Sequence, residues 1–228
     1  MYELYIGNKN YSSWSLRAWV LMRAAGIEFK EHLIPFGGPA WEDFLEISPS
    51  GKIPCLVDGS TLVWDSLAIT EYLAERHRGV WPQDVGARAW ARSAAAEMHS
   101  GFIELRNRCP MSVGVRLRLK ETPPALKRDT ARLETLWADG LDRFGGPFLA
   151  ARSFTAVDAF FAPVAYRVQS FGLELSPTAA GYTQRLLETP AMRQWYEAAL
   201  AENFRDAPHE AEMLSIAHVV GDLRAPAL

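Results

Sequence analysis

The spacing of apolar residues changes once along this chain, near residue 80, and that change limits the folds it can adopt. Before residue 80, short apolar runs typical of strands alternate with helical patterns. The predicted strands are 2–6, 29–35, 53–57 and 61–63, and the predicted helices are 15–25 and 65–77. Asp58-Gly59-Ser60 separates the last two strands, and an Asp-Gly pair favours a tight antiparallel turn. This order predicts a mixed sheet with helices on its faces.

From Arg88 onward only helical spacing remains. Three apolar stripes are Trp90/Ala94/Met98/Phe102/Leu105, Leu133/Leu136/Trp137/Leu141/Phe144 and Val157/Phe160/Phe161/Val164/Val168. The third is apolar nearly all round, which indicates a helix at the centre of a bundle. The predicted fold is therefore an α/β N-terminal thioredoxin-like domain plus an all-α C-terminal helical bundle. The Gly- and Pro-containing linker at 78–87 divides it into domains 1–78 and 87–228.

Composition excludes several classes of function. With 24 basic and 27 acidic residues spread along the chain, the net charge of −3 offers no footprint for nucleic acid. The apolar stretches are too short to cross a membrane, and residues 1–10 lack a secretory signal pattern, so we expect a cytoplasmic protein. The two cysteines form no CxxC pair and the five histidines no ligand spacing, so we expect no metal.

The first candidate functional cluster is the serine-rich loop before the first predicted helix, which contains Ser12, Ser13 and Ser15. Free amides and the helix dipole favour an anion there. If that anion is a thiolate, a serine hydroxyl that donates a hydrogen bond to it lowers the thiol pKa and provides more nucleophile at neutral pH. Taken alone, the same residues are also typical of a polar loop with a helix cap.

Two further clusters have the chemistry to hold an extended peptide. Pro54 opens a predicted strand, where a cis bond would expose the backbone of Ile53 to a ligand, and Lys52 would meet a carboxylate. Asp65 and Ser66 open a helix, where a carboxylate suits an ammonium group, and a hydroxyl with its amide suits a carboxylate. The alternative is a strand-start proline, a solvated lysine and an ordinary helix cap.

In this order, the three clusters resemble the soluble glutathione transferase family. They look like its catalytic loop, its cis-proline edge and its γ-glutamyl site, and the 154–158 segment Phe-Thr-Ala-Val-Asp looks like the capping box of its central helix. The resemblance covers about residues 1–205 and leaves 206–228 unassigned. It implies glutathione as co-substrate, a homodimer with part of its interface on the Trp90, Ala94, Met98 stripe or its polar flank, and catalysis by Ser12, supported by Ser13.

The loop is similar to that of the zeta and related serine classes, but Trp14 stands where the zeta loop has a cysteine. We therefore expect conjugation of glutathione to a small hydrophobic electrophile, with Ser12 or Ser13 as thiolate partner and Lys52, Ile53, Asp65 and Ser66 as glutathione-binding residues. One alternative is a glutathione-dependent cis-trans isomerase of the maleylacetoacetate or maleylpyruvate type, with basic candidates Arg106, Arg108, Arg116 and Arg118. Another is a glutathione-binding protein without catalysis. Trp14, Trp41, Met111 and Tyr166 are candidates to line an apolar pocket, although such aromatics are more often core.

Overall fold

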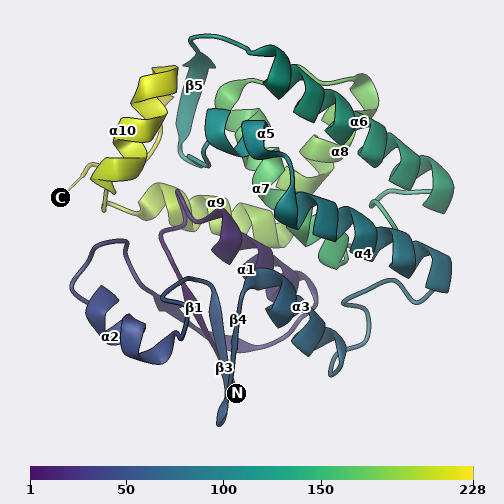
Figure 1. Cartoon of the computed structure of the whole chain (residues 1–228), viewed down its shortest axis with the longest axis horizontal. Helices are drawn as coiled ribbons and strands as arrows, with labels where there is room; N and C mark the ends of the chain where they lie inside the picture. Colours follow the sequence, from purple (N-terminus) through teal and green to yellow (C-terminus); the bar gives the residue numbers. More distant parts are fainter. Residues whose placement is uncertain (228) are drawn as a thin grey trace.

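A computed structural model describes residues 1–227, and its first part is built on a four-stranded sheet (Figure 1). The elements are β1 (Tyr2–Ile6), α1 (Ser13–Ala24), β2 (Phe29–Leu33), α2 (Trp41–Ile47), β3 (Cys55–Asp58), β4 (Thr61–Trp64) and α3 (Ser66–Ala74). The strand order is β2-β1-β3-β4, with β1 parallel to β2 and the other neighbours antiparallel. This is the predicted mixed sheet, including the hairpin at Gly59.

Both faces of the sheet are buried, because successive apolar side chains along a strand point to opposite faces. Leu4 and Leu56 join the main core on the side of α1 and α3, whereas Cys55 packs with Phe44 of α2 on the other side. Cys55 is fully buried, and burial raises the pKa of its thiol to about 11. Cys55 is therefore a core residue.

The second part is helical, as predicted. Its elements are α4 (Val85–Ser100), α5 (Ile103–Arg108), β5 (Val115–Leu119), α6 (Pro124–Phe144), α7 (Ala156–Phe171), α8 (Pro177–Glu188), α9 (Pro190–Ala201), α10 (Ala207–Ile216) and β6 (Ala217–Asp222). None of the helices within residues 1–227 combines the length and the apolar character needed to cross a membrane. The division into units 1–78 and 87–228 stays a prediction, with α3 ending at Ala74 and α4 beginning at Val85.

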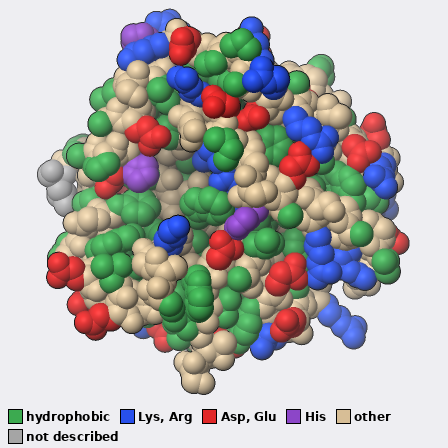
Figure 2. Space-filling view, in the orientation of Figure 1, with side chains coloured by type: hydrophobic (Ala, Val, Ile, Leu, Met, Phe, Trp, Pro, Cys, Tyr) green, Lys and Arg blue, Asp and Glu red, His purple; other side chains and the backbone are tan. Residues whose placement is uncertain are grey.

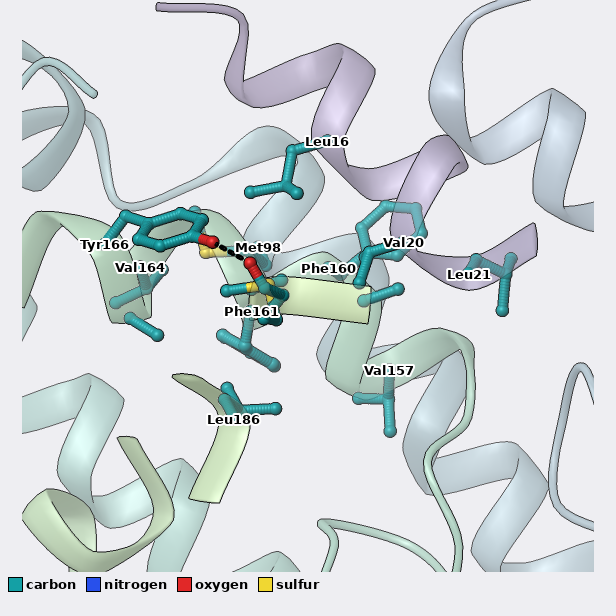
Figure 3. Close-up of a cluster of buried hydrophobic side chains, with 14 of the residues drawn as sticks. Leu16, Val20, Leu21, Met98, Val157, Phe160, Phe161, Val164, Tyr166 and Leu186 are labelled. Carbon is teal, nitrogen blue, oxygen red and sulfur yellow. Dashed lines mark hydrogen bonds between the residues drawn. The ribbon is translucent and has the colours of Figure 1, made fainter. Parts of the chain in front are cut away.

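Helix α7 lies at the centre of the helical part and contacts α1, α4 and α8. Its residues from Ala156 to Arg167 are all buried. Leu16 and Val20 of α1 lie close to Phe160 of α7 in the core (Figure 3). The prediction of a central helix from its nearly continuous apolar surface is confirmed.

The start of α7 is fixed by a buried carboxylate. Asp158 accepts hydrogen bonds from the amides of Thr155 (2.9 Å) and Leu149 (3.1 Å) and from the Tyr182 hydroxyl (2.8 Å). Thr155 and Asp158 form the predicted capping box. The Thr155 hydroxyl is a fourth donor, at 3.3 Å. Burial raises the pKa of Asp158 to about 6, and the four hydrogen bonds oppose that rise.

Two features of the helical part differ from the sequence expectation. The stripe from Trp90 to Leu105 does not follow one helix, because Gly101 is extended and Phe102 has a φ of 55°, which separates α4 from α5. In addition, β5 and β6 form a small antiparallel sheet that the sequence analysis missed. Periodicity over a few residues could not reveal this sheet, because its two strands lie about a hundred residues apart.

The Asp158 interactions yield a stability prediction. Asp158→Ala should lower the free energy of unfolding by about 3 kcal/mol, since it leaves two buried amides and two buried hydroxyls without their acceptor. Urea denaturation would measure the loss, with Asp142→Ala on an exposed part of α6 as control. Equal stability of the two variants would contradict a central role for the capping box.

Candidate functional site

The predicted site residues line two adjoining cavities where the sheet part meets the helices. The first, called here the Asp65 cavity, has a volume of about 490 Å³ and is lined by residues that include Lys52, Ile53, Asp65 and Ser66. The second, the Ser13 cavity, measures about 380 Å³ and includes Ser12 and Ser13. Trp14, Lys52 and Ile53 line both. All six predicted residues therefore lie around one continuous region.

Helix α3 presents its N-terminus to the Asp65 cavity. Asp65 caps the helix by accepting from the amides of Leu67 (2.7 Å) and Ala68 (3.4 Å), and it has the unusual φ of 73°. Ser66 is fully buried, and its hydroxyl has no hydrogen-bond partner among the described residues. A buried hydroxyl without a partner is costly unless a ligand or water meets it. Asp65 therefore caps α3 as foreseen, and the Ser66 hydroxyl beside it is available to a ligand.

Ile53 offers its backbone to the region between the two cavities. The Ile53–Pro54 peptide bond is cis, as the resemblance implied. Within residues 1–227, neither the amide nor the carbonyl of Ile53 makes a backbone hydrogen bond. Gly7 leaves room for the Ile53 side chain, because a Cβ at Gly7 would lie 2.2 Å from its Cδ1 atom. The main chain of Ile53 is therefore available to pair with an extended ligand.

The two serines of the loop have different partners. Ser12 is the N-cap of α1: its Oγ donates to Ser15 Oγ (2.7 Å) and accepts from the Ser15 amide (3.3 Å). Ser15 Oγ in turn accepts from the Gly7 amide (3.1 Å). The Ser12 hydroxyl is thus fully engaged in holding the loop.

The Ser13 hydroxyl accepts from Arg167 Nη2 at 3.3 Å, and its own proton has no acceptor among the described residues. It lies in the first turn of α1, where the helix dipole favours negative charge. Arg167 is only 4% exposed, and its Nε donates to the Cys109 carbonyl at 2.7 Å. Burial, with Arg106 nearby, lowers the pKa of Arg167 to about 10, so it remains charged at neutral pH.

Arg167, Arg17 and Arg106 form a group of buried or half-buried arginines. None of the three has a carboxylate partner among the described residues. Arg17 is 1% exposed and stacks on the rings of Trp14 (4.3 Å) and Phe160 (4.9 Å). Burial, together with the charges of Arg106 and Arg167, lowers the pKa of Arg17. Among residues 1–227, none of the three forms a salt bridge. Buried cations usually pair with anions, so this region favours a negatively charged ligand.

The structure separates the basic candidates of the sequence analysis. Arg106 lines the Ser13 cavity and donates to the carbonyls of Met98, His99 and Gly101. The other three candidates do not line this cavity. Arg108 pairs with Glu104 and Glu121. Arg116 donates a hydrogen bond to the Tyr196 hydroxyl, and Arg118 is exposed on β5. Of the four basic candidates, Arg106 alone therefore lies at the Ser13 cavity.

Arg167 was missed altogether, although it is the one basic residue in a nearly apolar α7, which is a signal that the sequence carries. Of the aromatic and methionine candidates, Trp14, Trp41 and Met111 line the Ser13 cavity. Tyr166 instead lies in the core, where its hydroxyl donates to the Met192 carbonyl at 2.6 Å (Figure 3). The face shown in Figure 2 carries hydrophobic side chains with basic, acidic and histidine side chains among them.

The segment beyond residue 205 folds back onto the serine-rich loop before α1. The Tyr11 hydroxyl donates to Glu210 (2.7 Å) and accepts from Arg224 (3.0 Å). Arg224 also pairs with Glu210 (2.6 Å) and Asp222 (2.7 Å). Burial and the bond to Glu210 raise the pKa of Tyr11, which keeps its hydroxyl protonated. Tyr11 therefore anchors the C-terminal segment to the loop.

Comparison with known proteins agrees with this geometry. Residues 11–76 match the family model described as glutathione S-transferase, N-terminal domain. Glutathione S-transferase 1 of Dianthus caryophyllus is 26% identical, over 76% of this chain and 80% of the relative. A probable maleylacetoacetate isomerase of Caenorhabditis elegans is 28% identical, over 82% and 89%. A stringent starvation protein A homologue of Coxiella burnetii is 23% identical, over 88% and 91%.

Solved structures share the fold. A Burkholderia glutathione transferase homologue with bound glutathione superimposes with a TM-score of 0.66 at 22% identity, covering 87% of this chain and 97% of the other. A diazinon-metabolizing glutathione S-transferase of the silkworm Bombyx mori gives a TM-score of 0.69 at 18% identity, covering 87% and 96%. The sheet part with its helical partner is thus the architecture of these proteins.

Proposed function

The chain belongs to the soluble glutathione transferase family, and we propose that it binds glutathione across the two cavities and activates the thiol beside Ser13. The observation that carries this proposal is the Ser13 hydroxyl, which accepts from Arg167 and has its own proton free at the start of α1. A thiolate there accepts that proton in a hydrogen bond, and the helix dipole and Arg167 add favourable electrostatics.

The Asp65 cavity fits the rest of the tripeptide. The Asp65 carboxylate suits the γ-glutamyl ammonium, and the unpartnered Ser66 hydroxyl suits the adjacent carboxylate. The free main chain of Ile53 pairs with the cysteinyl residue, and the exposed Lys52 meets the glycine carboxylate. These assignments place the sulfur at the junction of the cavities, where Trp14 and Ile53 line both.

Ser12 has a different role in this proposal from the one that its position in the family loop implied. Its hydroxyl already donates to Ser15 and caps α1, so donation to a thiolate would require this hydrogen bond to be broken or reversed. Ser12 therefore holds the backbone of the loop, and Ser13 donates to the sulfur. The bound thiolate attacks an electrophile held against Trp14, Trp41 and Met111.

A second candidate function is favoured by the arginines of the Ser13 cavity. Arg106 and Arg167 line this cavity without a carboxylate partner, and the guanidinium fork matches a carboxylate. An electrophile that carries a carboxylate would satisfy them. Addition of glutathione to a conjugated diacid, followed by its departure after rotation, would make the protein an isomerase.

We also propose that the protein forms a homodimer through an apolar strip on β4 and α3. The strip contains Leu62, Val63, Trp64, Leu67 and Ala68, and Trp64 is 44% exposed. An exposed apolar patch of this kind marks an interaction surface. The stripe considered from the sequence is unsuitable, because Ala94 and Met98 are buried inside the chain. Trp90 packs on Phe144 instead.

The first prediction concerns the two serines. Ser13→Ala should lower kcat/KM with a chlorodinitrobenzene-type substrate roughly 10- to 100-fold, the effect of one lost hydrogen bond to a charged group. Glutathione affinity by calorimetry should stay within a few-fold. Ser12→Ala is the matched control, and it should mainly lower the stability of the fold, by about 1 kcal/mol, through the lost cap. A larger loss of rate in Ser12→Ala would reverse the assignment, and no heat of binding at millimolar glutathione would refute the function.

The second prediction concerns the anionic substrate. Arg106→Gln should raise KM for a maleyl-type diacid roughly 10- to 100-fold and leave KM for the aromatic chloride nearly unchanged, because only the diacid pairs with the guanidinium. Arg118→Gln, on the exposed face of β5, serves as control. No turnover of the diacid by the unchanged protein would eliminate this candidate and leave conjugation.

The third prediction concerns the dimer. Ala68→Glu places a charge on the apolar strip without disturbing the monomer core, since Ala68 is exposed. Light scattering should then show a monomer, whereas Ala180→Glu, exposed on α8, should leave a dimer. A dimer in both variants would place the interface elsewhere.

A further inference from the structure

The C-terminal segment brings an oriented histidine to the Ser13 cavity. Helix α10 begins at Ala207, and Asp206 is its N-cap. One oxygen of Asp206 accepts from the His209 backbone amide (3.1 Å) and contacts the ring Nδ1 (2.6 Å). Asp206 is itself buried. The carboxylate therefore fixes both the position of the imidazole and the proton on Nδ1.

Two aromatic side chains stack on this ring. His209 stacks on Tyr11, with centroids 5.2 Å apart and planes at 20°, and on Phe36, at 5.2 Å and 27°. Its Nδ1 lies against Asp206. The side chain is nevertheless 34% exposed, and His209 lines the same cavity as Ser12 and Ser13. Nε2 is therefore the ring nitrogen that Asp206 leaves free, on a side chain that lines the cavity.

Nε2 has no hydrogen-bond partner within residues 1–227, and with Nδ1 protonated it is a free acceptor. A carboxylate that orients a histidine whose other nitrogen faces a nucleophile is an arrangement suited to proton transfer. Glu212 lines this cavity too, but it has no partner that fixes its orientation. Tyr11 is excluded as an acceptor because its hydroxyl is held by Glu210 and Arg224.

We propose that His209 is the acid-base residue of the Ser13 cavity, with Asp206 as its positioning residue. This inference rests on the proposed binding of glutathione. Nε2 accepts the proton of the cysteinyl thiol, so that the S–H bond breaks and the sulfur keeps the electron pair as a thiolate facing Ser13. The imidazolium is stabilised by Asp206.

The same proton is then returned when the electrophile is a conjugated carbonyl compound. The thiolate forms a C–S bond at the β-carbon, and the π electrons move toward the α-carbon and carbonyl. Nε2 gives its proton to the α-carbon, which leaves the imidazole neutral and the adduct complete. With an aromatic chloride the leaving chloride takes the electron pair, so no proton needs to reach carbon and His209 releases its proton to water.

The difference between these two reactions provides the test. His209→Gln should lower kcat/KM for addition to an α,β-unsaturated ketone about a hundredfold, the lower range of general acid-base catalysis. For the aromatic chloride at alkaline pH, where solution base ionises the thiol, the loss should be at most a few-fold. Asp206→Asn should lower the ketone reaction less, because an amide oxygen still accepts from the ring and the helix amide.

Two controls separate proton transfer from damage to the fold. Added imidazole should restore part of the ketone rate to His209→Ala and nothing to His218→Ala, whose side chain is exposed on β6. Equal losses in both reactions, no loss in either, or no rescue by imidazole would overturn the role of His209. Binding of glutathione by the unchanged protein, measured first by calorimetry, shows whether a failure lies here or in the proposed function itself.

Discussion

The packing of α1 against α7 is the constraint on which the site depends. Helix α1 carries the serine loop at its start, and α7 carries Arg167 beyond its apolar middle. Because Leu16 and Val20 are buried beside Phe160, Ser13 and Arg167 come within hydrogen-bond distance although 154 residues separate them. A shift of one helical turn between these helices would separate the hydroxyl from the guanidinium. The packing of the core therefore sets the distance between the Ser13 hydroxyl and the Arg167 guanidinium.

The same packing buries positive charge without an equal negative charge. Arg17 and Arg167 are almost wholly buried, and aromatic faces and backbone carbonyls are their neighbours. Such contacts offset part of the desolvation of a guanidinium but do not neutralise it. Buried positive charge near the start of α1 therefore favours the binding of a thiolate or carboxylate there.

Much of this fold could be predicted because local patterns and tertiary contacts agree. The alternation of β1 and β3, the Asp-Gly turn and the capping box at Thr155 each predict the element that the structure contains. The six candidate site residues also come together, because each lies at an element boundary that the pattern defines. The predictions failed where geometry is set by distant parts of the chain. The partner of Ser13 is on α7, and the β5–β6 pairing joins segments about a hundred residues apart.

The different roles of the neighbouring serines could not be predicted from the sequence either. Ser12 and Ser13 are the same residue type in the same loop, and only the acceptor at Ser15 and the donor at Arg167 distinguish them. No local spacing rule encodes that difference, because it depends on which hydroxyl turns inward at the first turn of α1. The structure is needed to show which proton is free.

The hydrogen bond of Tyr11 to Glu210 and Arg224 has a consequence for biosynthesis. The sheet part and most of the helices leave the ribosome before residues 206–224 exist, so the serine loop forms without its outer wall. A nascent chain that ends before residue 206 therefore lacks the cavity residues His209 and Glu212 as well as the partner strand of β5. A bulky fusion attached close behind Arg224 would compete with the contact between Arg224 and Tyr11.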